Sequence, residues 1–259
     1  MILVTVVTPS YKAERYLAHT IESVIAQTYP HWEMLLVDDS SPDNSNKLIE
    51  SYAERDNRIK LVKLKENSGA AVARNKAIEL AKGRYISFLD SDDTWLPTKL
   101  EQQVGYMQKN GIAFSYSAYE KVDELGVVIG KVGVPEKVGY SDLLKVCSIG
   151  CLTAIYDTSM LGKVYMPLIR KRQDLGLWLR ILKTIPFAYA TPGVLAQYRI
   201  RSDSISANKK VAAQYTWKLY REVEGLNLLM ASYYFSHYAV NGVLRTKLPR
   251  IAKFLGILK

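Results

Sequence analysis

An apolar run that ends in an acidic turn reads Tyr85-Ile86-Ser87-Phe88-Leu89-Asp90-Ser91-Asp92-Asp93. Its first five residues have the length and character of a buried strand. Several carboxylates at the exit of such a strand repel one another, and a divalent cation removes that cost. Mg²⁺ and Mn²⁺ prefer oxygen ligands and bind through one or two carboxylates, water and substrate phosphates. The turn therefore predicts a metal and phosphate site, although Asp92 or Asp93 as the cap of a helix near Trp95 explains it equally well.

Three further apolar runs precede this turn, at residues 2–8, 33–37 and 59–64. Between the runs lie segments with apolar residues near helical spacing, at residues 13–27, 44–55 and 70–81. Strands that alternate with helices are typical of an α/β fold. We predict a mostly parallel central sheet with helices on its faces.

A polar cluster follows each predicted strand, and ligands of open parallel sheets bind at this edge. The clusters are Thr8-Pro9-Ser10-Tyr11, Asp38-Asp39-Ser40-Ser41, Asn67-Ser68-Gly69 and the acidic turn. The Asp38-Asp39 pair could bind a nucleobase or ribose, or it could form a cap or Asx-turn. Tyr11 could stack on a base or simply pack. Arg74, one turn into the third helix, suits a diphosphate, a carboxylate of the acidic turn, or a surface ion pair.

The chain is basic, with 35 Lys and Arg against 25 Asp and Glu and a formal net charge of +10. This excess favours an anionic partner, such as a nucleotide, a nucleic acid or a membrane surface. The basic residues are scattered rather than aligned beside an aromatic platform, so we expect no nucleic acid. Without a signal peptide or about twenty consecutive apolar residues, the chain is expected to be cytoplasmic.

The second half has less regular signals. Glycines among Val and Ile in residues 114–139 predict meandering strands or a hairpin. Helices are expected after Asp142, over residues 174–184, and from residue 207 onward. Cys147 and Cys151, four residues apart, are interpreted as small buried residues on one helix face rather than zinc ligands.

In order and spacing, the four strand-end motifs, with Ala73-Arg74-Asn75 after the third, resemble those of family 2 glycosyltransferases, and the resemblance covers about residues 2–206. It implies a GT-A (Rossmann-like) fold, a nucleotide-diphosphate sugar donor, usually a uridine one, and an inverting reaction. No processive Gln-x-x-Arg-Trp motif is present. The nearest resemblance is therefore to bacterial transferases of O-antigen, capsule or teichuronic-type polymers, which implies a saccharide acceptor, lipid-linked at the inner membrane face.

Carried over by motif, the resemblance implies a set of donor-binding residues. These are Thr8, Pro9, Tyr11, Glu14 and Asp39 around the base, and Gly69, Arg74, Asp90, Ser91 and Asp92 near the nucleotide. Asp92 would be the ligand of Mn²⁺ or Mg²⁺. Arg201 stands where the family often has a metal-binding histidine, and arginine does not ligate. Either Asp92, phosphates and water hold the ion, or Arg201 gives its charge directly to the diphosphate.

Asp174 is the candidate catalytic base, because Arg172-Gln173-Asp174 resembles the family segment that carries this group. The family more often has Glu-Asp here, so Gln173 is a departure. An inverting transfer needs a carboxylate that takes the proton of the acceptor hydroxyl. Asp174 would also lie at a helix start, where the helix dipole favours the ionised form and where Asp is a common N-cap.

The resemblance divides the chain into a GT-A domain at residues 1–206 and a helical, basic extension at 207–259. Residues 1–95 would bind the nucleotide sugar and residues 96–206 the acceptor. The tail at 245–259 has a basic amphipathic pattern that suits either an anionic lipid surface or packing against the core. The alternative functions are a nucleotidyltransferase acting on a sugar phosphate, in which Asp174 has no clear purpose, and a nucleic-acid-binding module.

Overall fold

The computed structural model describes residues 2–201 and 209–247, which form a ten-stranded sheet in the order β3-β2-β1-β4-β9-β6-β10-β5, with β7 and β8 paired to β6 and β10. Four strands of the N-terminal half run parallel to one another. They are β1 (Val4–Ser10), β2 (Trp32–Asp38), β3 (Ile59–Lys63) and β4 (Tyr85–Phe88). The predicted α/β class with a mostly parallel sheet is confirmed.

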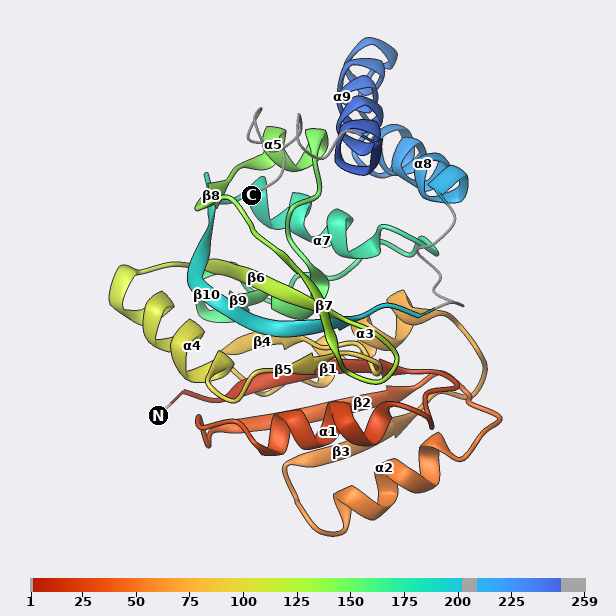
Figure 1. Ribbon diagram of the computed structural model, residues 1–259, viewed down its shortest axis with the longest axis vertical. Coiled ribbons are helices and arrows are strands. Elements are labelled where there is room, and N and C mark those ends of the chain that lie inside the picture. Colours follow the sequence, from red (N-terminus) through yellow and green to blue (C-terminus); the bar gives the residue numbers. More distant parts are fainter. Residues whose placement is uncertain (1, 202–208, 248–259) are drawn as a thin grey trace.

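Three helices connect these strands, α1 (Leu17–Ile25), α2 (Ser45–Ala53) and α3 (Ala70–Leu80). Side chains alternate between the two faces of each strand. Val6 therefore packs with α1 and α2 in one apolar cluster, while its neighbour Val7 packs with α3 in the other. Figure 1 shows α1 and α2 on one side of the sheet and α5, α7, α8 and α9 on the other.

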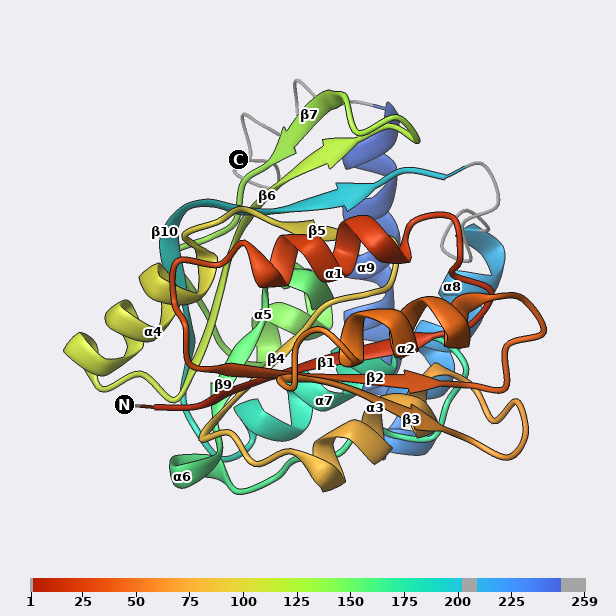
Figure 2. The ribbon, with the colours of Figure 1, turned by 90° about the horizontal axis from the view of Figure 1, so that it is seen from below.

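After the acidic turn the topology becomes mixed. A short strand β5 (Thr94–Trp95) leads to α4 (Lys99–Asn110), and β9 (Ile155–Asp157) lies antiparallel between β4 and β6. The remaining strands are β6 (Phe114–Val122), β7 (Val128–Val132), β8 (Lys137–Val138) and β10 (Ala188–Arg199). The predicted hairpin is confirmed, because β6 and β7 pair antiparallel and project from one edge of the molecule (Figure 2).

The helix-cap interpretation of the acidic turn is wrong. Helix α4 begins at Lys99, its N-cap position is Thr98, and no side chain caps it by a hydrogen bond. Strand β5 separates Asp92 and Asp93 from that helix, because residues 94–95 pair with β10. The two carboxylates are therefore available for other partners.

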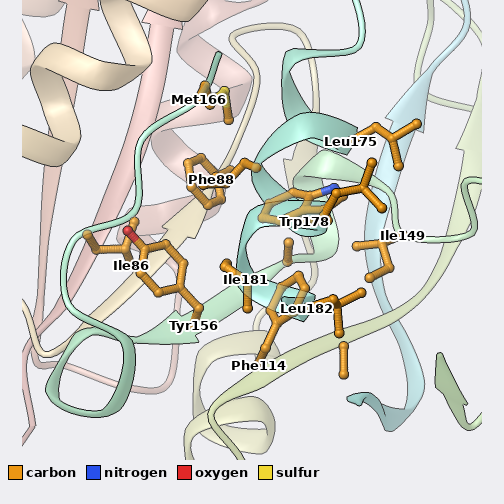
Figure 3. Packing of buried hydrophobic residues seen from close by; sticks show 14 of the residues in the cluster. Ile86, Phe88, Phe114, Ile149, Tyr156, Met166, Leu175, Trp178, Ile181 and Leu182 are labelled. Atoms are coloured by element: carbon orange, nitrogen blue, oxygen red, sulfur yellow. The ribbon is translucent and has the colours of Figure 1, made fainter. Parts of the chain in front are cut away.

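Helix α7 (Gln173–Leu182) is anchored by an aromatic cluster beneath it (Figure 3). The Trp178 ring meets Phe88 of β4 edge-on, with centroids 5.4 Å apart, and lies 5.1 Å from the ring of Phe114. Burial of large aromatic side chains contributes most of the free energy that holds such an element in place. This packing fixes the first turn of α7, with Asp174, at the edge of the sheet where β4 ends.

The smaller helices of this half are α5 (Tyr140–Lys145), α6 (Thr158–Leu161) and a 3-10 helix at Cys151–Thr153. Cys147 follows α5 and Cys151 opens the 3-10 turn, so the two cysteines do not share a helix face as predicted. Both thiols are free and half-buried rather than fully buried.

The C-terminal helices pack on the side of α5 and α7 (Figure 1). They are α8 (Lys209–Lys218), a π-helix (Leu219–Val223) and α9 (Leu228–Lys247). Leu219, Tyr220 and Ala231 are fully buried in the same cluster as Trp178. In the described ranges, no helix is long and apolar enough to cross a membrane. Most of the amphipathic tail at 245–259 lies outside the described residues.

Candidate active site

A cavity of about 720 Å³ opens at the carboxyl ends of β1, β2 and β4 and reaches the first turn of α7. Nine of the predicted site residues line it. They are Pro9, Tyr11, Asp39, Arg74, Asp90, Ser91, Asp92, Asp174 and Arg201. Residues far apart in sequence thus meet in one cavity, as expected for the strand-end edge of an open sheet.

Asp39 joins the ends of two neighbouring strands. Its carboxylate accepts hydrogen bonds from the backbone N–H groups of Ser68, at 2.7 Å, and Gly69, at 2.8 Å. Gly69 has a φ of 93°, which only glycine adopts without strain. Gly69 therefore serves the site through its backbone and is not part of the cavity wall.

Asp38, the other member of this acidic pair, has a purely local role. Its carboxylate accepts from the backbone N–H of Ser41, at 2.8 Å, and from Nδ2 of Asn46, at 3.1 Å. The Asx-turn alternative thus holds for Asp38, while Asp39 faces the cavity.

Besides Gly69, two other predicted donor-binding residues do not reach the cavity wall. Thr8 is fully buried in β1, and its hydroxyl group has no hydrogen-bond partner among the described residues. Glu14 lies at the surface, where it accepts from the backbone N–H of Asn44, at 3.2 Å, and from its Nδ2, at 3.0 Å.

Arg74 forms a buried ion pair rather than the surface pair that the sequence left open. Its side chain is 9 % exposed and its guanidinium donates to the Asp90 carboxylate. Burial is the largest single influence and lowers the pKa of Arg74, but the charge and hydrogen bond of Asp90, together with the charges of Cys151 and Asp174, raise it by more, so the net shift is upward. Arg74 thus stays charged and holds Asp90 at the centre of the cavity.

The other two carboxylates of the acidic turn lie close enough to Asp90, and to each other, for their negative charges to repel. Asp92 pairs with Arg201, with Oδ2 and Nη1 3.0 Å apart, and Asp93 accepts from the backbone N–H of Arg199 at 2.9 Å. Burial, followed by the charge of Asp90, raises the pKa of Asp92; burial and the charge of Asp92 raise that of Asp93. A bound cation would relieve this repulsion.

The protein alone offers few metal ligands here. In residues 2–201 and 209–247, no three His, Cys, Asp or Glu side chains form a group that could hold a metal ion. Mg²⁺ and Mn²⁺ are usually coordinated by one or two carboxylates, substrate phosphates and water. Asp92 fits this pattern if the ion binds together with the phosphates of the nucleotide sugar.

Arg199 is a structural residue of this site that the motifs did not single out. Its Nε donates to the backbone oxygen of Asp92, at 3.0 Å, and its Nη1 to that of Asp123, at 3.0 Å. Arg199 therefore fastens the acidic turn to the β6–β7 hairpin. Arg199 is the last residue of β10, and no spacing in the sequence signals this role.

Asp174 lies in the first turn of α7 and lines the same cavity as the acidic turn. The prediction that it is the N-cap is wrong, because that position is Arg172, whose φ of 65° is left-handed. The carboxylate is half-buried.

Gln173, which departs from the family pattern, forms hydrogen bonds with both the oxygen and the nitrogen of its side-chain amide. Its oxygen accepts from Nη1 of Arg74, at 2.9 Å, and from the backbone N–H of Ala71, at 3.3 Å. Its nitrogen donates to the backbone oxygens of Ile169, at 2.9 Å, and Arg170, at 3.1 Å. A glutamate could not donate to these two carbonyl groups.

Asn75 makes a second link of the same kind. Its Nδ2 donates to the backbone oxygen of Met166, at 2.9 Å, and its Oδ1 accepts from the Met166 N–H, at 2.8 Å. Helix α3 therefore holds the acidic turn through Arg74 and the segment before Asp174 through Gln173 and Asn75.

A mostly parallel sheet whose strand-end cavity contains an acidic turn, a buried arginine and the carboxylate of Asp174 is typical of a glycosyltransferase of the GT-A fold. The family model described as Glycosyl transferase family 2 matches residues 5–160. The chain belongs to this family, which leaves no support for a nucleotidyltransferase or a nucleic-acid-binding module.

Two curated relatives match over almost their whole length. The chain is 48 % identical to the protein named "Putative teichuronic acid biosynthesis glycosyltransferase TuaG" of Bacillus subtilis. The match covers 93 % of this chain and 96 % of TuaG. It is 41 % identical to UDP-Glc:alpha-D-GlcNAc-diphosphoundecaprenol beta-1,3-glucosyltransferase WfgD of Escherichia coli, over 93 % of this chain and 94 % of WfgD.

Solved structures share the fold at low sequence identity. S. aureus TarS 1-349 in complex with UDP-GlcNAc superposes with a TM-score of 0.72 at 19 % identity, over 99 % of this chain and 79 % of TarS. The mannosyltransferase PcManGT from Pyrobaculum calidifontis, in complex with GDP-Man and Mn²⁺, gives a TM-score of 0.66 at 18 % identity, over 98 % of this chain and 78 % of PcManGT.

Proposed function

We propose that the protein transfers a hexose from a UDP-sugar to a saccharide that is linked through a diphosphate to a lipid, during synthesis of a cell-surface polysaccharide. The names of WfgD and TuaG support this substrate class and this biosynthetic setting. The observation that carries the proposal is the single cavity in which the strand-end motifs face Asp174. A lipid-linked acceptor places the reaction at the cytoplasmic surface of the membrane.

The nucleoside end of the cavity is formed by Pro9, Tyr11 and Asp39 in this proposal, and the diphosphate lies over Asp90 to Asp92. Asp92, the donor phosphates and water would hold Mn²⁺ or Mg²⁺, which stabilises the charge on the departing diphosphate. The Mn²⁺ in the complex of PcManGT supports this assignment. Arg201, paired with Asp92, adds positive charge at the same place.

Asp174 accepts the proton of the acceptor hydroxyl group as its oxygen attacks the anomeric carbon of the donor. The new bond forms on the face opposite the departing diphosphate, the bond from the anomeric carbon to the phosphate oxygen breaks, and UDP leaves. The configuration at the anomeric carbon is therefore inverted. The presence of Asp174 in the same cavity as the acidic turn supports this role.

The substitution Asp174→Asn tests the base. It keeps the shape of the side chain but removes the proton acceptor, so we expect kcat to fall by about 10²–10⁴-fold. The assay uses UDP-glucose, Mn²⁺ and a water-soluble N-acetylglucosaminyl diphosphate carrying an alkyl chain. Calorimetric affinity for UDP should stay unchanged.

Glu54→Gln is the matched control, because Glu54 is exposed and does not line the cavity. It should leave both kcat and UDP binding unchanged. Full turnover by Asp174→Asn would contradict the base assignment, and loss of UDP binding in that variant would make Asp174 a donor ligand instead.

A further inference from the structure

The cavity wall beside Asp174 is strongly basic. Arg170, Lys171 and Arg172 line it consecutively, and we refer to these three residues as the basic loop. Among the described lining residues, six basic side chains face four carboxylates. The basic ones are Lys12, Arg74, Arg201 and the basic loop; the acidic ones are Asp39, Asp90, Asp92 and Asp174.

Two basic side chains at the acidic turn are already paired with carboxylates. Arg74 binds Asp90, and Arg201 binds Asp92. In the basic loop, by contrast, Arg172 donates to the hydroxyl oxygen of Tyr238 at 2.8 Å, a neutral partner. The exposed side chain of Arg170 has neither a hydrogen bond nor an ion pair within the described parts of the chain. Much of the positive charge of the cavity is therefore concentrated on the acceptor side.

The basic loop is held in place before any substrate arrives. The Gln173 amide binds the backbone oxygens of Ile169 and Arg170, and Asn75 grips the backbone of Met166 just upstream. The Arg172 guanidinium lies 5.5 Å from the centroid of the Tyr238 ring on α9. A charged loop fixed at both ends loses little conformational entropy when it binds an anion.

We propose that the basic loop binds the diphosphate of the lipid-linked acceptor, an inference that rests on the proposed function. The acceptor hydroxyl group must reach Asp174. If the acceptor is a single sugar joined to the lipid through the diphosphate, the diphosphate lies one sugar ring away from that hydroxyl group. Residues two to four positions before Asp174 are within that range, since consecutive Cα atoms are about 3.8 Å apart. Guanidinium groups suit phosphate oxygens because they donate two parallel hydrogen bonds. Leu168, 74 % exposed, precedes the basic loop and offers an apolar contact to the lipid beyond it.

The double substitution R170Q/K171Q tests this assignment with two acceptors that carry the same sugar. One is N-acetylglucosaminyl diphosphate on a water-soluble alkyl chain, and the other is an uncharged alkyl glycoside. We expect KM for the diphosphate acceptor to rise about tenfold or more, since each charge-assisted hydrogen bond contributes strongly. KM for the uncharged acceptor and for the UDP-sugar should change by less than about twofold.

The control K47Q/K109Q removes the same charge from exposed positions outside the cavity and should leave all three KM values unchanged. Equal losses with both acceptors would overturn the inference, because the basic loop would then not recognise the diphosphate. A rise in KM for the UDP-sugar alone would assign the basic loop to the donor.

Failure of the proposed function gives a different result. In that case the wild-type protein transfers hexose to neither acceptor, and calorimetry with the alkyl diphosphate sugar in the presence of UDP tests the basic loop by itself. Binding that is about tenfold weaker in R170Q/K171Q supports the loop as a diphosphate site, and equal binding rejects it.

Discussion

Lys99 is a fully buried lysine whose partners are neutral. Its Nζ donates to Oε1 of Gln103, at 2.6 Å, and to Oγ of Ser87, at 3.1 Å, and it lies 3.9 Å from the ring centroid of Trp95. Burial lowers the pKa of Lys99 well below its ordinary value, because the interior disfavours the ammonium form. In the unfolded chain the same group titrates near its usual pKa of about 10.4.

This difference makes stability depend on pH. Between the two pKa values the unfolded chain binds a proton that the folded protein does not, so the free energy of unfolding rises with pH until the unfolded pKa. We expect the free energy of unfolding to rise by at most about 1.4 kcal/mol per pH unit as the pH approaches the unfolded pKa of Lys99. Lys99→Met should remove this rise in urea unfolding, whereas Lys109→Met, at an exposed lysine of the same helix, should keep it. If the free energy of unfolding had the same pH dependence in the wild type and in Lys99→Met, Lys99 would not be neutral in the folded protein.

At this scale the sequence identified residue types but not their partners. Asp38 and Asp39 are adjacent carboxylates after one strand, and only the fold shows that one closes a turn while the other faces the cavity. Gln173 looked like a departure from the family pattern because the carbonyl groups it binds are invisible in a motif. For Arg74 the sequence left open a diphosphate, a carboxylate of the acidic turn or a surface ion pair, and only the fold identifies Asp90 as its partner.

Helix α7 contains a glycine that its propensity alone would not justify. Gly176 lies in mid-helix, where alanine is about 1 kcal/mol more favourable. A Cβ atom there would lie 2.9 Å from Cδ of Pro167, closer still to its Cγ, and 3.2 Å from Cδ1 of Leu219. We expect Gly176→Ala to lower the free energy of unfolding by about 1–3 kcal/mol, the usual cost of overpacking.

Gly105→Ala is the control for this substitution. Gly105 lies within α4, and its added Cβ would have no neighbour within 4 Å. This variant should gain about 0.5–1 kcal/mol in urea unfolding. If both substitutions stabilised the protein equally, the close approach of α7 to Pro167 would not be rigid.

The elements of the N-terminal half could be predicted to within a few residues, because apolar runs and helical spacing alternate there. Strand β1, for example, was expected at 2–8 and spans Val4–Ser10. The antiparallel insertion of β9 between β4 and β6 was not foreseeable, since three residues carry no periodic signal. The same holds for the two residues of β5, because the sequence allowed a helix to begin near Trp95.

The whole molecule has a core that extends beyond the predicted boundary at residue 206. Leu219, Tyr220 and Ala231 are buried with Trp178, and the Tyr220 hydroxyl donates to the backbone oxygen of Leu144. Whether residues 1–206 form a separate domain stays a prediction, and truncation tests it. We expect a chain ending at 206 to lose its cooperative thermal unfolding transition, because α7 would expose apolar surface to water.

A chain ending at residue 247 is the comparison, because it retains all the described contacts of α8 and α9. It should unfold cooperatively near the wild-type midpoint in circular dichroism. An unchanged midpoint for the chain ending at 206 would establish residues 1–206 as an independently stable unit.

Helix α3 contacts both the acidic turn and the segment before Asp174, and this limits how such enzymes can be recombined. Arg74 holds Asp90, while Gln173 and Asn75 bind α3 to the segment around Met166. A chimera that joins the donor half of one transferase to the acceptor half of another would separate these partners. New donor and acceptor pairings therefore require residues 71–75 and 166–173 to be transplanted together, as one cassette.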